Sequence, residues 1–177
     1  MNSKKSIVLV KPDITHCEFV MEYKSAFLKT GEEINGSGVL SNSESYEQWL
    51  DSIMMNEKTE TVKPGLVPAN TYLAINELDE IVGMINIRHI LNEHLLIEGG
   101  HIGYSVHPNH RQKGYATEIL KLGLAKCKNL NIDKVLVTCT TENIGSRKAI
   151  LNNGGVLENS VDVENETYER YWIKLED

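Results

Sequence analysis

Hydrophobic and polar residues follow two different periods along this chain, and the change of period separates predicted helices from predicted strands. Helical spacing of apolar residues predicts helices over 15–29, from a cap at Ser43 or Ser45 through Ile53, over 114–130 and over 143–152. Alternating or continuous apolar runs bounded by turn residues predict strands over 6–10, 71–75, 81–90, 101–106, 134–139, 155–163 and 167–175. The strand–helix–strand unit from His101 to Cys139 predicts a right-handed parallel crossover within a mixed, mostly antiparallel sheet. The predicted fold class is therefore α+β, with helices flanking the sheet.

Length, charge and cysteine content narrow the class of protein. The chain has 177 residues, which suits a single domain over 1–177. Its 18 Lys and Arg residues against 25 Asp and Glu residues give a net charge of −7, whereas a nucleic-acid partner requires a broad basic face. No segment reaches the roughly 20 apolar residues of a membrane span, so no membrane partner is predicted. The cysteines Cys17, Cys127 and Cys139 form no CxxC pair and indicate reduced thiols in a cytoplasmic protein.

The segment from His107 to Ala116 carries the clearest chemical signal. A predicted strand ends at His107, the following loop carries Arg111 and Lys113, and a predicted helix opens at Gly114. Backbone N–H groups at a helix start lack intrahelical partners, and the helix dipole places partial positive charge there. Glycine lets a bulky anion approach the backbone closely. The segment therefore predicts a pyrophosphate-binding loop, with an ordinary strand-to-helix turn as the alternative.

A second motif, Asn143-Ile-Gly-Ser146, follows one crossover later. The string Arg111-x-x-Gly114-x-Ala116 followed by this Asn-x-x-Ser resembles the GCN5-related N-acetyltransferase (GNAT) family in order and spacing. The resemblance extends over 81–155. It implies a GNAT-like sheet in which two central parallel strands splay apart, with acetyl-CoA as co-substrate in the gap. On this basis the domain divides into a variable acceptor-side region 1–70, an acetyl-CoA-binding core 71–155 and closing strands 156–177.

The resemblance also implies a binding site for acetyl-CoA, residue by residue. The residues expected to form it are Ser105, Val106, Arg111, Gln112, Lys113, Gly114, Tyr115, Ala116, Asn143 and Ser146. Backbone amides from Gln112 to Ala116 would hold the pyrophosphate, and Ser105 and Val106 would pair with the pantetheine amides like an added strand. A backbone N–H near Val106 would polarise the thioester carbonyl. Asn143 and Ser146 would face the sulfur end, although Asn143 could equally serve as a helix N-cap.

The catalytic groups are less determined. Many family members carry a tyrosine that protonates the departing thiolate, at the position that Ile150 occupies here. Ser146 or a water could substitute, or the thiolate could leave unprotonated. For the general base, which must take a proton from the acceptor amine, the candidates are Glu98 and His101 just before the central strand. The alternatives are a solvated loop carboxylate and a hydrogen-bonded structural histidine.

These features together predict an acetyl-CoA-dependent N-acetyltransferase that transfers the acetyl group to a primary amine of a small molecule or peptide by direct attack. Cys139 lies in an apolar strand, where burial raises the pKa of a thiol and disfavours a covalent intermediate. The missing tyrosine motivates an alternative, a non-catalytic acyl-CoA-binding or sensing domain. A longer acyl chain and a homodimer remain open.

For the acceptor of the acetyl group, the net charge of the chain is the only guide that the sequence offers. The net acidity of the chain favours a polyamine, an aminoglycoside or a peptide amine over an anionic acceptor. No metal is predicted, because HExxH is absent and the potential ligands are irregularly spaced. Those potential ligands are His89, Glu93, His94, Glu98 and His101.

Overall fold

A computed structural model describes residues 6–176, so that both ends of the predicted domain, 1–5 and 177, lie outside the described residues. The strands are β1 (Ile7–Val10), β2 (Ala69–Asn76), β3 (Ile81–Arg88), β4 (Ile102–Val106), β5 (Lys134–Thr140), β6 (Val156–Val163) and β7 (Glu166–Lys174). The helices are α1 (Cys17–Thr30), α2 (Tyr46–Met55), α3 (Glu93–Ile97), α4 (Tyr115–Asn129) and α5 (Ile144–Asn152), with short 3-10 turns at Ile14–His16, Leu40–Asn42 and Pro108–His110. The predicted α+β class with antiparallel sheets and flanking helices is confirmed.

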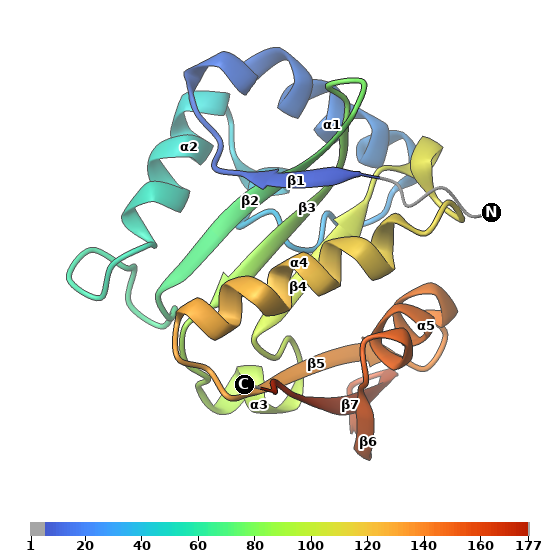
Figure 1. Ribbon diagram of the computed structural model, residues 1–177. Coiled ribbons are helices and arrows are strands. Elements are labelled where there is room, and N and C mark those ends of the chain that lie inside the picture. The colour runs from blue at the N-terminus through green and yellow to red at the C-terminus, as the bar shows by residue number, and fades with distance from the viewer. Residues whose placement is uncertain (1–5, 177) are drawn as a thin grey trace.

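The strands form two antiparallel sheets with the orders β1-β2-β3-β4 and β5-β7-β6. In Figure 1, the second sheet lies below α4, apart from the long strands β2 and β3. The two sheets meet where the backbone N–H of His101, just before β4, donates to the carbonyl of Leu136 in β5 (2.8 Å). Beyond this point β4 and β5 form no ladder, so the crossover joins two sheets rather than two paired strands of one sheet.

Helices cover both faces of the first sheet. One apolar cluster packs α4 against β3, β4 and β5, and a second cluster packs α1 and α2 against β2 and β3. Strand β3 is buried from Ile81 to Ile87 because it has a helix on each side, which explains its nearly continuous apolar sequence. The gap between the sheets therefore begins at β4, the last strand of this covered sheet.

The segment between β3 and β4 differs from its predicted loop. It contains the short helix α3, and the side chain of Asn92 caps it by accepting a hydrogen bond from the Leu95 N–H (2.9 Å). The N-cap of α2 is Ser45, one of the two predicted candidates. Among residues 6–176, no helix is long and apolar enough to cross a membrane.

Candidate active site

A cavity of about 430 Å³ occupies the gap between the two sheets. It is lined by Ile102, Gly103 and Tyr104 of β4, Thr138, Cys139 and Thr140 of β5, Asn143 and Ser146 at the start of α5, Glu166 and Tyr168 of β7, and Glu33, Asn35, Gly36, Arg88, His94, Glu98 and Gly99. The predicted residues Glu98, Asn143 and Ser146 are thus brought together, although Glu98 lies between α3 and β4 and the other two lie at the start of α5. The loop that is predicted to bind phosphate lies at the other end of β4.

The loop before α4 has the backbone shape of an anion site. Gln112 (φ 59°) and Gly114 (φ 84°) both adopt the left-handed conformation, and Tyr115 and Ala116 begin the first turn of α4. Such alternation turns successive N–H groups toward one point, and no side chain caps this helix start. A Cβ built on Gly114 would meet no atom within 4 Å, so the loop is open on that side. This geometry fits a pyrophosphate held by backbone amides.

The charged side chains of this loop already have protein partners. Arg111 forms a bidentate ion pair with Glu32 (3.0 and 2.8 Å) and lies 5.6 Å from the centre of the Phe27 ring. The Arg111 guanidinium holds the pKa of the Glu32 carboxyl below its usual value. The ammonium of Lys113 donates to the carbonyl of Asn109 (2.9 Å). Sequence reasoning could not find the Glu32 contact, because the two partners lie far apart in the chain.

Strand β4 presents alternate backbone groups to the gap. The N–H of Arg88 in β3 donates to the carbonyl of His101, just before β4 (2.8 Å), and the N–H of His107, just after β4, donates to the carbonyl of Val82 in β3 (2.9 Å). These two bonds fix the phase of the ladder. Because residues bonded to β3 recur at every second position, the backbone N–H and C=O groups of Ser105 face β3. The backbone groups of Tyr104 and Val106 face the other way, toward the open edge of β4. The Ser105 hydroxyl contacts the Tyr23 hydroxyl on α1 (2.9 Å). Of the predicted pantetheine contacts, the register therefore favours Val106, and it adds Tyr104, which sequence analysis missed.

His101 is part of the junction between the sheets. Its Nδ1 accepts a hydrogen bond from the Leu136 N–H (2.9 Å), and its ring packs edge-on against Trp172. Burial, and then the nearby Arg88 guanidinium, lower the pKa of His101 to about 4. A nitrogen lone pair that is already engaged in this way is poorly placed to take a substrate proton. The geometry favours the structural alternative for His101.

This depressed pKa gives a prediction on stability. The unfolded chain binds the His101 proton below about pH 6.5 whereas the folded chain does so near pH 4, so the stabilisation is present above pH 6.5 and is lost as pH falls toward 4. We expect His101→Asn, which keeps an acceptor that does not titrate, to reduce the drop in unfolding free energy between pH 7 and pH 5 by about 1 kcal/mol. Urea denaturation at both pH values measures this, with exposed His94→Asn as the control. An equal drop in His101→Asn and wild type would contradict the assignment.

Glu98 lies on the acceptor side of the gap, opposite α5. Its carboxylate is 3.2 Å from Nδ1 of His94, and its side chain is 27% exposed, so it is accessible from the cavity. The hydroxyl of Tyr168 donates to Glu166 (2.8 Å), and burial together with the carboxylates of Glu166 and Glu98 raises the pKa of Tyr168. The carboxylates of Glu98 and Glu166 therefore both line this cavity.

A pair of hydroxyl groups lines the gap where β4 approaches the start of α5. Ser146 Oγ and the Tyr104 hydroxyl are 2.8 Å apart, and burial raises the pKa of Tyr104 to about 12. Asn143 accepts a hydrogen bond from the Ser146 N–H (3.0 Å), which confirms the N-cap alternative for Asn143. Ile150 is fully buried in the apolar core, so its side chain supplies no proton donor.

Covalent and metal chemistry find little support in this site. Burial, followed by the Glu169 carboxylate, raises the pKa of the Cys139 thiol to about 11, so this thiol is neutral at physiological pH. Within residues 6–176, no group of three or more His, Cys, Asp or Glu side chains is arranged to hold a metal ion.

Comparison with known proteins defines the class. Residues 16–156 match the acetyltransferase (GNAT) domain family, and the chain belongs to that family. The chain is 28% identical over 109 residues to the uncharacterized N-acetyltransferase YnaD of Bacillus subtilis (strain 168), a match that spans 57% of this chain and 60% of YnaD.

Solved structures share the fold at low sequence identity. The microcin C7 self-immunity acetyltransferase MccE, in complex with acetyl-CoA and AMP, superposes with a TM-score of 0.69 at 17% identity, over 98% of this chain and 94% of MccE. Mycobacterium smegmatis RimJ, in complex with CoA-disulfide, gives a TM-score of 0.68 at 18% identity, over 95% of this chain and 81% of RimJ. The family resemblance read from the two motifs is confirmed.

Proposed function

We propose that this protein is an acetyl-CoA-dependent N-acetyltransferase that acts on a primary amine of a small molecule or peptide. One observation carries the proposal: a single cavity joins the hydroxyl pair of Tyr104 and Ser146 to the Glu98 carboxylate, beside the open edge of β4. An anion loop lies beyond the far end of that strand. We further expect the protein to act in the cytoplasm, without a nucleic-acid or membrane partner, and a homodimer stays a prediction.

Each group has a role in binding. The amides around Gln112 and Gly114 would bind the pyrophosphate, and Tyr104 and Val106 would pair with pantetheine amides through the strand edge. Acetyl-CoA, when bound, supplies an activated acyl carbon in its thioester. An N–H at the edge of β4 would donate to the carbonyl oxygen as negative charge develops on it.

The residues of this cavity can account for the proton transfers and the acetyl transfer. Glu98 would remove one proton from the acceptor ammonium, directly or through one water. The amine lone pair then forms the N–C bond, and the C–S bond breaks with its electron pair on sulfur. The nitrogen, which becomes positively charged as it attacks, releases its second proton to solvent and is left as a neutral amide. Because the pKa of Tyr104 is raised, its hydroxyl keeps its proton and would donate a hydrogen bond through Ser146 to the departing thiolate. Solvent can supply the thiol proton, since a thiolate with a pKa near ~8.5 is a good leaving group.

A paired substitution tests the hydroxyl pair. We expect Ser146→Ala and Tyr104→Phe each to lower kcat by roughly 10- to 100-fold, the value of a hydrogen bond to a charged group, with CoA affinity unchanged. The double variant should lose no more than either single variant, because both act through one contact. Steady-state kinetics and calorimetry measure these quantities. A loss of several hundredfold in Ser146→Ala would identify Ser146 as the general acid, and unchanged rates would exclude the pair.

Turnover distinguishes this proposal from a non-catalytic acyl-CoA-binding domain. The purified protein is mixed with acetyl-CoA and a panel of free amino acids, polyamines, an aminoglycoside and peptides with free amines. We expect thiol release together with a product heavier by one acetyl group on nitrogen. Binding of acetyl-CoA without any acetylated product would instead support the sensing domain.

A further inference from the structure

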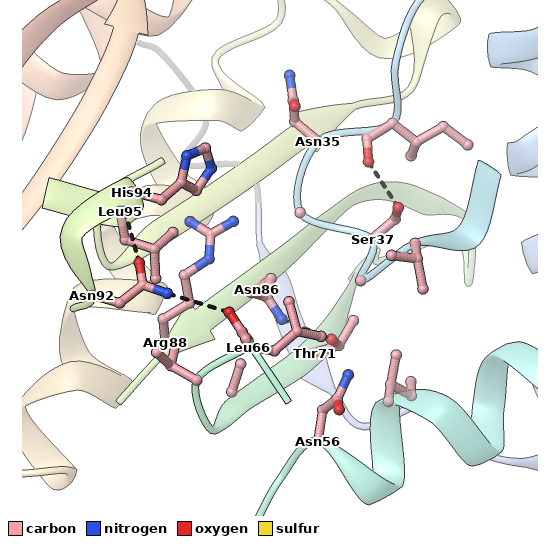
Figure 2. Close-up of a pocket in the computed structure, with 18 residues that line it drawn as sticks. Asn35, Ser37, Asn56, Leu66, Thr71, Asn86, Arg88, Asn92, His94 and Leu95 are labelled. Atoms are coloured by element: carbon pink, nitrogen blue, oxygen red, sulfur yellow. Dashed lines mark hydrogen bonds between the residues drawn. The ribbon is translucent and has the colours of Figure 1, made fainter. Parts of the chain in front are cut away.

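Arg88 lies where two cavities meet. It ends β3, and it lines both the gap cavity and a neighbouring cavity of about 330 Å³ beneath the loop from Ile34 to Val39. Figure 2 shows the guanidinium extending from β3 into this neighbouring cavity, between His94 and Asn86. Its volume is at the lower end of the roughly 300–1,000 Å³ of small-molecule pockets. It suits a small ligand rather than a folded partner.

The Arg88 guanidinium has no carboxylate partner among residues 6–176. Its Nη1 donates to the carbonyl oxygens of Gly99 (2.8 Å) and Gly100 (3.1 Å), and within residues 6–176 the Nε and Nη2 groups have no acceptor. None of the ion pairs in the described part of the chain includes Arg88. Burial lowers the pKa of Arg88 to about 10, which still leaves it protonated at neutral pH. A partly buried positive charge without a counter-ion is costly, so such a group is suited to bind an anion from outside the chain.

Neighbouring glycines leave room for this guanidinium. A Cβ on Gly103 would lie 3.1 Å from Nη2 of Arg88, and a Cβ on Gly99 would lie 3.6 Å from Nη1. Side chains at these positions would crowd the planar group. The fixed orientation presents the remaining donors as a fork, the geometry that carboxylates accept.

The charges around the two cavities differ in sign. Among the described residues that line the cavity beneath Ile34–Val39 there is no Asp or Glu, and Arg88 is its only permanent charge. The gap cavity carries the carboxylates of Glu33, Glu98 and Glu166. A ligand with a carboxylate at Arg88 and an ammonium group in the gap would match both.

We infer that the acceptor is a free amino acid, whose carboxylate binds Arg88 and whose amine points into the gap toward Glu98. The side chain of the amino acid then occupies the cavity beneath Ile34–Val39, which combines apolar walls such as Ile53 and Leu95 with the polar groups of Asn86. This inference rests on the proposed acetyltransferase function and gives it a substrate class. It reverses the preference for a non-anionic acceptor that net charge suggested.

The test compares carboxylates with their amides. Wild-type protein and acetyl-CoA are incubated with a mixture of the twenty standard L-amino acids, and separately with a mixture of the corresponding carboxamides; products are quantified by mass spectrometry. We expect acetylation of one or more amino acids at least about 100-fold faster than of their amides, because the amides leave a charged donor unpaired. This comparison needs no variant, so it holds even if substitutions at Arg88 impair folding.

Variants of Arg88 test whether this residue causes the preference for amino acids over their amides. Arg88→Gln should raise the KM of the preferred amino acid at least about 100-fold and reduce the preference over its amide, with the KM of acetyl-CoA unchanged. Arg88→Lys should recover part of the preference for the amino acid over its amide. The recovery is partial because lysine keeps the positive charge but replaces the planar fork with a point charge. Lys121→Gln, which removes an exposed charge from α4, is the control and should match wild type.

The outcomes separate the two claims. If carboxamides, spermine or peptide amines are acetylated as well as amino acids, the N-acetyltransferase function stands and the Arg88 assignment is overturned. If no amine is acetylated, the proposed function fails, and thermal-shift assays with each amino acid in the presence of CoA decide on Arg88. Stabilisation by amino acids but not by their amides, lost in Arg88→Gln, would support the carboxylate site. If amino acids do not stabilise the protein, the carboxylate site at Arg88 is overturned together with the proposed function.

Discussion

Replacing Gly114 with glutamate should abolish CoA binding while the protein stays folded. The substitution places a negative charge where the amides of the loop converge, and the added side chain would occupy the open side of Gly114. Like-charge repulsion and steric exclusion together should weaken the Kd by at least about 100-fold, equivalent to roughly 3 kcal/mol. Calorimetric titration of CoA measures the change. Binding to wild type should also weaken as salt is raised, because exposed phosphate contacts are screened.

The matched control for this variant is Gly114→Asn. The φ of 84° is strained for any L-residue, at roughly 1–2 kcal/mol, but asparagine tolerates the left-handed region best and adds no charge. We expect Gly114→Asn to lower the melting temperature about as much as Gly114→Glu and to keep measurable CoA affinity. If folded Gly114→Glu binds CoA as wild type does, the pyrophosphate lies elsewhere.

Replacing Glu98 with glutamine should lower kcat/KM by roughly 10²–10⁴ without changing acetyl-CoA affinity, the loss expected for a missing general base. The carboxylate lines the same cavity as the hydroxyl pair of Tyr104 and Ser146, so it can reach an amine there directly or through water. The wild-type pH–rate profile should have a rising limb that the variant lacks. Steady-state kinetics from pH 5 to pH 9, with the acceptor amine varied at saturating acetyl-CoA, measure both effects.

The control for Glu98 is Glu93→Gln, which removes an exposed carboxylate from α3 outside both cavities. It should leave the rate and its pH dependence unchanged. Replacing His94 with glutamine removes the ion-pair partner of Glu98 and should have a smaller effect than Glu98→Gln. Near-wild-type rates in Glu98→Gln at every pH would show that the amine enters neutral or loses its proton to a water chain.

Local periodicity predicted most of the helices and strands because the spacing of apolar residues matches the faces that the fold buries. The alternation over 71–75 and the continuous apolar run over 81–87 follow from which faces of the sheet are covered. The short helix α3 escaped prediction because its five residues are too few to establish a period, and the N-cap Asn92 is its main local signal.

The register of β4 could not be read from the sequence. Alternation assigns side chains to two faces, but which backbone groups remain free depends on the pairing with β3. The choice of Tyr104 over Ser105 at the open edge therefore needed the ladder. His101 is a similar case, because its Nδ1 is engaged by a residue of β5 that lies 35 positions away.

Net charge and the lining of the two cavities give different expectations for the acceptor. A total of −7 averages over the whole surface, whereas a ligand experiences the few charges that line its cavity. Among residues 6–176, the acceptors of the Arg88 guanidinium are the carbonyl oxygens of Gly99 and Gly100 and not a carboxylate, which is a result of tertiary packing.

By itself, the sequence determined the family and the position of the loop that is predicted to bind phosphate. The backbone geometry of such a loop is local, and Gly114 at the start of a helix is its main signal in the sequence. Only the tertiary structure decided which side chains share the gap between the two sheets, because the residues that meet there belong to β3, α3, β4, β5, β7, the start of α5 and two loops. Their contacts depend on long-range packing, which no local pattern of residues encodes.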